Sequence, residues 1–201
     1  MKIPTAGVAE KLLLEGERLN PGQWAAHSRY AATAAKNIAA ACPGMDPEAA
    51  YAMGLLHDIG RREGPGHLIH VMDGYRYLQS LGYEDGARIC LTHSFFTNSV
   101  KTYLGNQDCS PEDHEWLAGY ISHCDYDDYD KLLQLCDALA LPQGFCVVEK
   151  RMVDVTMRYG FKPYTLDKWK AIFDRKAYFD SKTGGNIYAL LPGIEQSTFG
   201  Y

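Results

Sequence analysis

The side chains best suited to chemistry in this sequence are histidines and aspartates in its first two thirds. All seven histidines lie between residues 27 and 123, and one of them, His57, is directly followed by Asp58. Imidazole nitrogens and carboxylate oxygens are together typical ligands of transition metals. The His-Asp pair alone is weak evidence, so the positions around each histidine must show whether these side chains gather at one place.

His27 lies on the apolar face of a segment that has helical spacing. Trp24, His27, Ala31 and Ile38 recur at the three- and four-residue intervals of one helix face, so His27 is expected to point inward among small residues. A buried imidazole needs hydrogen-bond partners. Taken alone, this position favours a hydrogen-bonded core histidine over a metal ligand.

The second helical segment places several functional groups on adjoining rows. His57 and Asp58 each lie three or four residues from both Gly54 and Arg61, and Gly54 lets a neighbouring helix approach closely. This arrangement puts two adjacent ligands where another helix can meet them.

Asp137 is the carboxylate most in need of a cation. It shares a stripe with Leu133, Ala140 and Leu141, and a carboxylate on an apolar stripe is costly unless it is paired or bound to metal. Asp130, near the start of the same segment, has a simpler explanation, because carboxylates are favoured there by the helix dipole.

The elements that position these residues are predicted to be helices. Asn20-Pro21, Asp46-Pro47 and Ser110-Pro111 each combine an N-cap residue with a proline that a first helical turn accepts. We expect helices over residues 22–42, 46–61, 69–81, 84–93, 110–123, 127–141, 146–159 and 165–179. Strand-like alternation is scarce and no repeat or linker is found, which predicts a single all-α domain over residues 1–201 with an irregular tail after residue 181.

Composition narrows the classes of partner. The 201 residues are 46% hydrophobic and 22% charged, with a net charge of -5, so the chain is expected to fold and lacks the positive charge that long nucleic acids attract. A small phosphorylated ligand remains compatible with this balance. The six cysteines form no CxxC pair, and neither a signal segment nor an apolar membrane span is recognised. We therefore expect a cytoplasmic protein with reduced thiols and no membrane contact; its oligomeric state is left open.

The pattern resembles the HD-domain metal-dependent phosphohydrolases. In that family a His, a His-Asp pair and a distant Asp come from separate helices, and the matching positions are His27, His57-Asp58 and Asp137. The resemblance covers about residues 20–160 and implies an all-α helical bundle. Residues 161–201 are then a C-terminal helix and tail. A mixed nitrogen and oxygen site suits a divalent transition metal, with iron or manganese favoured and nickel, cobalt or zinc also compatible.

Two further histidines resemble ligands of a second metal ion. His70 begins a His-x-x-x-Gly pattern that ends at Gly74, which favours it over His67, and His93 follows in a later helical segment. The resemblance implies that His70 and His93 hold the second ion and that Asp58 bridges both. The alternative is a one-metal site in which His70 and His93 support the ligands or contact substrate.

The implied activity is hydrolysis of a phosphate ester or anhydride in a small, nucleotide-like substrate by a metal-activated water. Asp58 is the predicted catalytic residue, orienting the nucleophile, and Arg61, Arg62 and His67 are predicted substrate-binding residues. Both arginines are equally compatible with a solvated helix end, and His67 with a surface loop. The alternatives in function are a one-metal HD nucleotidase and a metal-containing HD module that senses a ligand without turnover. Later cations such as Arg151 are more typical of solvated side chains, although one of them could line the pocket mouth.

Overall fold

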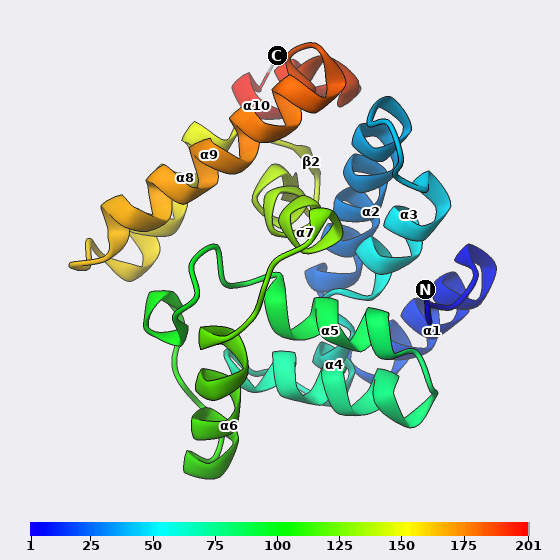
Figure 1. Ribbon diagram of the computed structural model, residues 1–201, viewed down its shortest axis with the longest axis vertical. Coiled ribbons are helices and arrows are strands. Elements are labelled where there is room, and N and C mark those ends of the chain that lie inside the picture. The colour runs from blue at the N-terminus through cyan, green and yellow to red at the C-terminus, as the bar shows by residue number, and fades with distance from the viewer. Residues whose placement is uncertain (201) are drawn as a thin grey trace.

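The computed structural model describes residues 1–200, and within them the chain is almost entirely helical (Figure 1). Its α-helices are α1 (Ala6–Leu19), α2 (Gln23–Ala41), α3 (Pro47–Leu56), α4 (Ile69–Ser80), α5 (Glu84–Thr92), α6 (Pro111–Ser122), α7 (Asp128–Leu139), α8 (Val148–Tyr159), α9 (Thr165–Thr183) and α10 (Ile194–Phe199). Short 3-10 helices are η1 (Ile59–Glu63), η2 (Val100–Thr102) and η3 (Ile187–Leu190). Strands β1 (Ala140–Leu141) and β2 (Gly144–Phe145) form one antiparallel hairpin. The predicted all-α fold class is confirmed.

Two of the three predicted helix starts are made by the expected caps. The Asp46 carboxylate accepts hydrogen bonds from the backbone N–H groups of Glu48 and Ala49, and the Ser110 hydroxyl accepts one from Asp113. Asn20 does not cap α2. It ends α1 instead, and its side-chain amide donates to the Arg61 carbonyl at 2.6 Å.

Several predicted boundaries are wrong, and helix α1 was not expected at all. The helix predicted over 46–61 ends at Leu56, and the chain then turns through His57 and Asp58 into η1. The helix predicted over 127–141 ends at Leu139, because Ala140 pairs with Phe145 in the hairpin. The tail after residue 181 is not wholly irregular, since it contains η3 and α10.

Close backbone contacts hold together the elements that carry the His-Asp pair. A Cβ atom at Gly54 would lie 2.4 Å from the Ala32 Cα, so glycine allows α3 to pack directly on α2. A Cβ atom at Gly60 would lie 1.9 Å from the His70 carbonyl oxygen, so η1 packs equally closely on α4. These contacts set the positions of α2, α3, η1 and α4 relative to one another.

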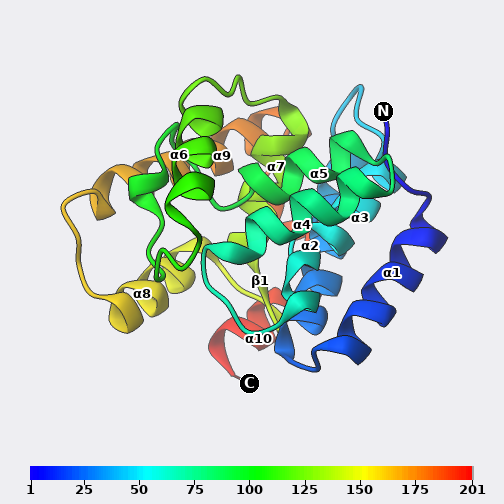
Figure 2. The ribbon, with the colours of Figure 1, turned by 90° about the horizontal axis from the view of Figure 1, so that it is seen from below.

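Helix α7 lies centrally among the remaining elements. Figure 1 shows it nearly end-on, and it packs against α2, α3 and α5 on one side and α8 and α9 on the other. Figure 2 shows α4 and α5 side by side, with α1 along one edge of the molecule. Residues on α7 therefore reach both the helices before residue 93 and those after residue 148.

A buried ion pair joins α5 to α7. The Asp130 carboxylate is fully buried and accepts hydrogen bonds from the Arg88 guanidinium, at 3.0 Å from Nε, and from the Thr92 hydroxyl at 2.7 Å. It also accepts the Asp127 backbone N–H, which completes a capping box. Asp130 therefore lies at a helix start as expected, and its carboxylate also connects α7 to the end of α5 through hydrogen bonds.

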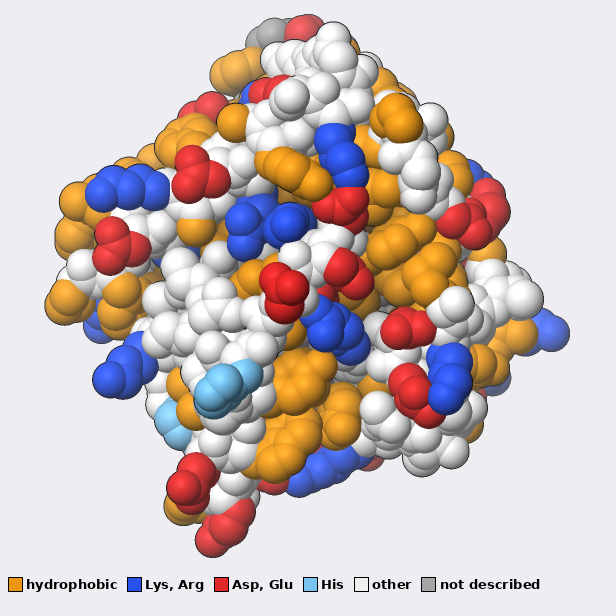
Figure 3. Space-filling model, viewed as in Figure 1, with side chains coloured by type: hydrophobic (Ala, Val, Ile, Leu, Met, Phe, Trp, Pro, Cys, Tyr) orange, Lys and Arg blue, Asp and Glu red, His pale blue; other side chains and the backbone are white. Residues whose placement is uncertain are grey.

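The helices described for residues 1–200 and the face shown in Figure 3 bear on membrane contact and on the distribution of charge. None of the helices described for residues 1–200 has the length and apolar character to cross a bilayer. Acidic and basic side chains are interspersed on the face shown in Figure 3. All six cysteines are free thiols.

Candidate metal centre

The structure brings the six predicted ligands to one place from five separate segments. His27 comes from α2, His57 and Asp58 from the turn after α3, His70 from the first turn of α4, His93 from the residue after α5, and Asp137 from the last turns of α7. The four histidines and Asp58 are buried, whereas the Asp137 side chain keeps 27% of its surface exposed. The cluster therefore lies at the bottom of an opening rather than inside a sealed core.

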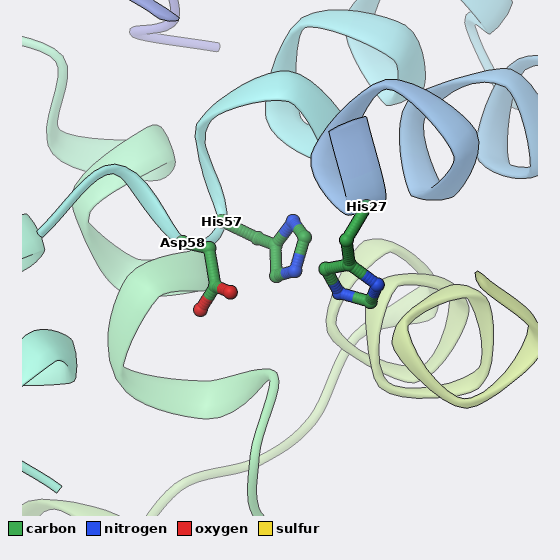
Figure 4. A group of neighbouring side chains, drawn as sticks. All are labelled: His27, His57 and Asp58. Atoms are coloured by element: carbon green, nitrogen blue, oxygen red, sulfur yellow. The ribbon is translucent and has the colours of Figure 1, made fainter. Parts of the chain in front are cut away.

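The first ligand group consists of His27, His57 and Asp58, whose ligand atoms all lie within 4.8 Å of one another. Figure 4 shows the two imidazoles side by side, His27 coming from α2 and His57 from the turn after α3, with Asp58 next to His57. Asp137 closes this group, because its Oδ1 lies 3.0 Å from His27 Nε2 and 3.9 Å from His57 Nε2.

The second ligand group consists of Asp58, His70 and His93 and meets the same 4.8 Å limit. The Oδ1 atom of Asp58 lies 3.0 Å from His70 Nε2 and 3.6 Å from His93 Nε2, and these two nitrogens are 3.4 Å apart. Asp58 thus belongs to both groups, which is the position that the resemblance noted in the sequence implies for a bridging carboxylate.

The backbone selects the tautomer of all four imidazoles. The Nδ1 atoms of His27, His57 and His93 lie 3.2, 2.7 and 3.2 Å from the carbonyl oxygens of Ala140, Gly54 and Ile89. The Nδ1 atom of His70 likewise bonds the His67 carbonyl. A carbonyl only accepts hydrogen bonds, so Nδ1 is the donor in each ring and each Nε2 presents its lone pair to the cluster. This is the orientation that metal-ligating histidines require.

The electrostatics of the cluster favour the protonation states in which carboxylates and imidazoles bind metal. Burial lowers the pKa of His57 to about 4 and also lowers that of His70. Burial would raise the pKa of Asp58, but the Arg61 guanidinium at 2.7 Å and the neighbouring His70 and His57 together outweigh burial and hold that pKa well below its usual range. Asp137 behaves in the same way, because the neighbouring His27, Arg151 and His57 together outweigh burial and keep its pKa low. These carboxylates are ionised at neutral pH, and His57 and His70 are neutral.

His93 differs from His57 and His70 in the direction of its pKa shift. Burial lowers its pKa, but hydrogen bonding and attraction to Asp58 outweigh burial and raise it overall. Its Nε2 also lies 3.0 Å from the Ser94 hydroxyl.

The residues present fit a divalent cation. His57 Nε2 is buried and has no hydrogen-bond partner, which is costly for a polar atom unless something binds it. Around it, nitrogen lone pairs face carboxylate oxygens, and such a convergence of acceptors is stabilised by a positive ion between them. A bound metal ion would give His57 Nε2 a partner and would also offset the repulsion between the neighbouring nitrogen and oxygen lone pairs.

Comparison with known protein families matches residues 24–141 to the HD domain. The chain belongs to the HD-domain family. This places it in a superfamily of metal-dependent phosphohydrolases, and all six candidate ligands fall within the matched segment. Neither a curated protein nor a solved structure matches the chain. The assignment to the HD family confirms the resemblance seen in the sequence, whereas the division into an HD core over 20–160 and a C-terminal part stays a prediction.

The candidate metal ligands, which we call the HD ligands, lie against a cavity of about 740 Å³, which we call the HD cavity. Of the predicted substrate-binding residues, Arg61 lines this cavity. Its Nε atom donates to Asp58 Oδ2 at 2.7 Å and its Nη1 atom to the Gly66 carbonyl at 3.2 Å. Arg61 therefore holds Asp58 Oδ2 in place, and Asp58 Oδ1 is left directed at His70 and His93.

The other two predicted substrate contacts are not brought into this cavity. The guanidinium of Arg62 lies 3.8 Å from the centre of the Tyr77 ring, and its Nη2 lies 3.3 Å from Glu15, so it packs away from the HD ligands. His67 borders a smaller neighbouring cavity of about 450 Å³. The Arg62 position argues against its predicted role, and His67 is positioned mainly to hold His70 through its carbonyl.

The sequence allowed one later cation such as Arg151 to line the pocket mouth, but it did not single out the residues that the later helices add to the HD cavity. Arg151 and Arg158 on α8 and Lys168 on α9 line it, as do the aromatic rings of Tyr103 and Trp169. A signal for the arginines was available, because positions 151 and 158 lie seven residues apart on one helix face. Nothing in the sequence showed that this face turns toward the cluster.

Proposed function

We propose that this protein is a two-metal HD phosphohydrolase that cleaves a phosphate ester or anhydride of a small, nucleotide-like substrate. The observation that carries the proposal is the shared carboxylate, since Asp58 belongs to both ligand groups. His27, His57 and Asp137 would hold the first ion, and His70 and His93 the second. The mixed donor set favours iron or manganese over calcium.

Bound divalent ions supply the charge that activates a water molecule and neutralises the phosphoryl group. The chain itself supplies orientation. Arg61 holds one oxygen of Asp58, so the other oxygen keeps a fixed direction toward the reacting region. The backbone carbonyls hold the imidazoles in one orientation, so no ring has to rotate before binding.

The cavity supports a substrate of nucleotide size. Its volume of about 740 Å³ lies within the range of small-molecule pockets. Trp24, Phe96, Tyr103 and Trp169 line it and offer flat faces on which a base can pack. The net charge of -5 argues against a long nucleic acid, whereas a small anionic substrate is compatible with it because the cations that line the cavity can attract such a substrate locally.

The test combines metal analysis with a substrate panel. We expect purified protein to carry two transition-metal ions per chain and to hydrolyse at least one member of a panel of phosphomonoesters, cyclic nucleotides and dinucleoside polyphosphates with manganese or ferrous iron. Asp58→Ala should lose both ions and activity, and His93→Ala should lose one ion and about 100-fold in activity. His123→Ala is the matched control, because His123 is exposed and outside the cluster.

Each alternative gives a different result. One ion per chain, unchanged in His70→Ala, would establish the one-metal HD nucleotidase. Stoichiometric metal without turnover of any panel member would establish the ligand-sensing module. A fully active, metal-free Asp58→Ala enzyme would overturn the proposal as a whole.

A further inference from the structure

Helices α8 and α9 form one wall of the cavity although they lie outside the segment matched to the HD domain. They follow residue 141, pack against α7, and contact each other (Figure 1). This wall, which we call the α8–α9 wall, contributes the cations Arg151, Arg158 and Lys168 to the cavity. The sequence segment that defines the family therefore supplies the ligands, and a separate segment supplies most of the positive side chains.

Two of these cations have no anionic partner. Lys168 Nζ makes one long hydrogen bond, 3.5 Å to the Thr102 carbonyl, and lies 5.8 Å from the centre of the Phe96 ring. Arg151 is half-buried and, among residues 1–200, forms no ion pair within 4.0 Å. Arg61, in the same cavity, is by contrast held by Asp58 at 2.7 Å. Cations that line a cavity and have no counter-charge beside them are available to pair with an anionic ligand.

The carboxylates near the α8–α9 wall do not neutralise it. Asp137 attracts Arg151 and Lys168 at longer range, but its Oδ1 is bound by His27 at 3.0 Å and belongs to the candidate metal ligands. Asp154 also lines the cavity and forms no ion pair with the cations of the wall. Burial and the nearby Arg151 lower the pKa of Lys168 to about 8, which agrees with a site of uncompensated positive charge.

We propose that Arg151 and Lys168 bind a phosphate group of the substrate other than the one that is hydrolysed, so that the enzyme selects compounds with two or more phosphate groups over phosphomonoesters. This inference rests on the proposed function. A guanidinium forms two parallel hydrogen bonds to a phosphate and an ammonium adds a compact charge, so together they suit one phosphate group. The cavity of about 740 Å³ leaves room for a ligand that extends from the metal ligands to this wall.

The experiment measures binding to the metal-loaded protein by calorimetry with two non-hydrolysable probes. Methylenediphosphonate carries two phosphonate groups, and methylphosphonate carries one. We expect the wild-type protein to bind methylenediphosphonate at least tenfold more tightly, and the double variant Arg151→Met, Lys168→Met to lose at least tenfold in its affinity for this probe. Its affinity for methylphosphonate should stay within twofold, because that probe needs only the metal ions.

A matched variant controls for charge alone. Lys170→Met removes an exposed lysine of the same helix, whose side chain is 75% exposed, and should leave both affinities unchanged. Unchanged affinity of the double variant for methylenediphosphonate would overturn the inference, as would equal wild-type affinity for the two probes. Failure of the proposed function looks different, because the predicted probe preference would persist while no panel substrate is hydrolysed.

Discussion

Replacing Gly60 with alanine tests whether close packing of η1 on α4 sets the geometry of the second ligand group. A Cβ atom at position 60 would lie 1.9 Å from the His70 carbonyl oxygen and 2.4 Å from the Gly74 backbone nitrogen, whereas ordinary contacts begin at 3.4 Å. The two backbones must therefore separate by about 1.5 Å to accept a methyl group. Asp58 lies two residues before Gly60, so this separation pulls its carboxylate away from His70 Nε2, now 3.0 Å away.

The expected loss follows from these displacements. Overpacking of this kind costs about 1–3 kcal/mol of stability, and a shift of about 1 Å between groups that act together costs about 100-fold in activity. We expect Gly60→Ala to bind fewer than two metal ions per chain by elemental analysis and to unfold at lower denaturant concentration than wild type.

Gly119→Ala is the matched control for this substitution. Gly119 lies inside α6 with no atom within 4 Å of an added Cβ, so alanine there should stabilise the protein by about 0.5–1 kcal/mol through helix propensity. A Gly60→Ala protein with wild-type stability, two bound ions and full activity would refute the reasoning from backbone contact.

Three other substitutions or measurements test separate parts of the structure. Asp130→Ala removes the buried partner of Arg88 and should cost about 2–4 kcal/mol in chemical denaturation; a cost below about 0.5 kcal/mol would contradict a structural role. Acetylation of Lys168, followed by mass spectrometry, should show an inflection near pH 8, because its pKa is lowered to about 8 and the neutral amine is the reactive form; an inflection near the ordinary lysine value would contradict the effect of burial. Arg62→Ala should change KM less than twofold and cost about 0.5–1 kcal/mol of stability through loss of its contact with Tyr77, and a large rise in KM would restore its predicted role.

The features that the sequence predicted well depend on local interactions. Asp46 and Ser110 cap backbone groups two or three residues away, so short stretches of sequence were sufficient to predict the starts of α3 and α6. The His-Asp pair and its spacing from the other ligands are likewise properties of sequence, and the family assignment agrees with them.

The features that the sequence did not reveal depend on partners far along the chain. Helix α1 has no side-chain cap, and packing against α3 stabilises it instead. The sequence explains Asp130 only as a helix-start carboxylate, because its partner, Arg88, lies 42 positions away. Arg151 and Lys168 face the cavity only because α8 and α9 pack on α7, which no local pattern encodes.

The two ligand groups differ in how much of the chain must fold before each exists. The second group comes entirely from residues 58–93, and its histidines are tethered to carbonyls three or four positions earlier. The first group needs His27 and Asp137, and the carbonyl that orients His27 belongs to Ala140, 113 positions away. The two groups of the proposed site therefore depend on contacts of different range: the second is drawn from one stretch of 36 residues, whereas the first is complete only when α7 is docked on α2.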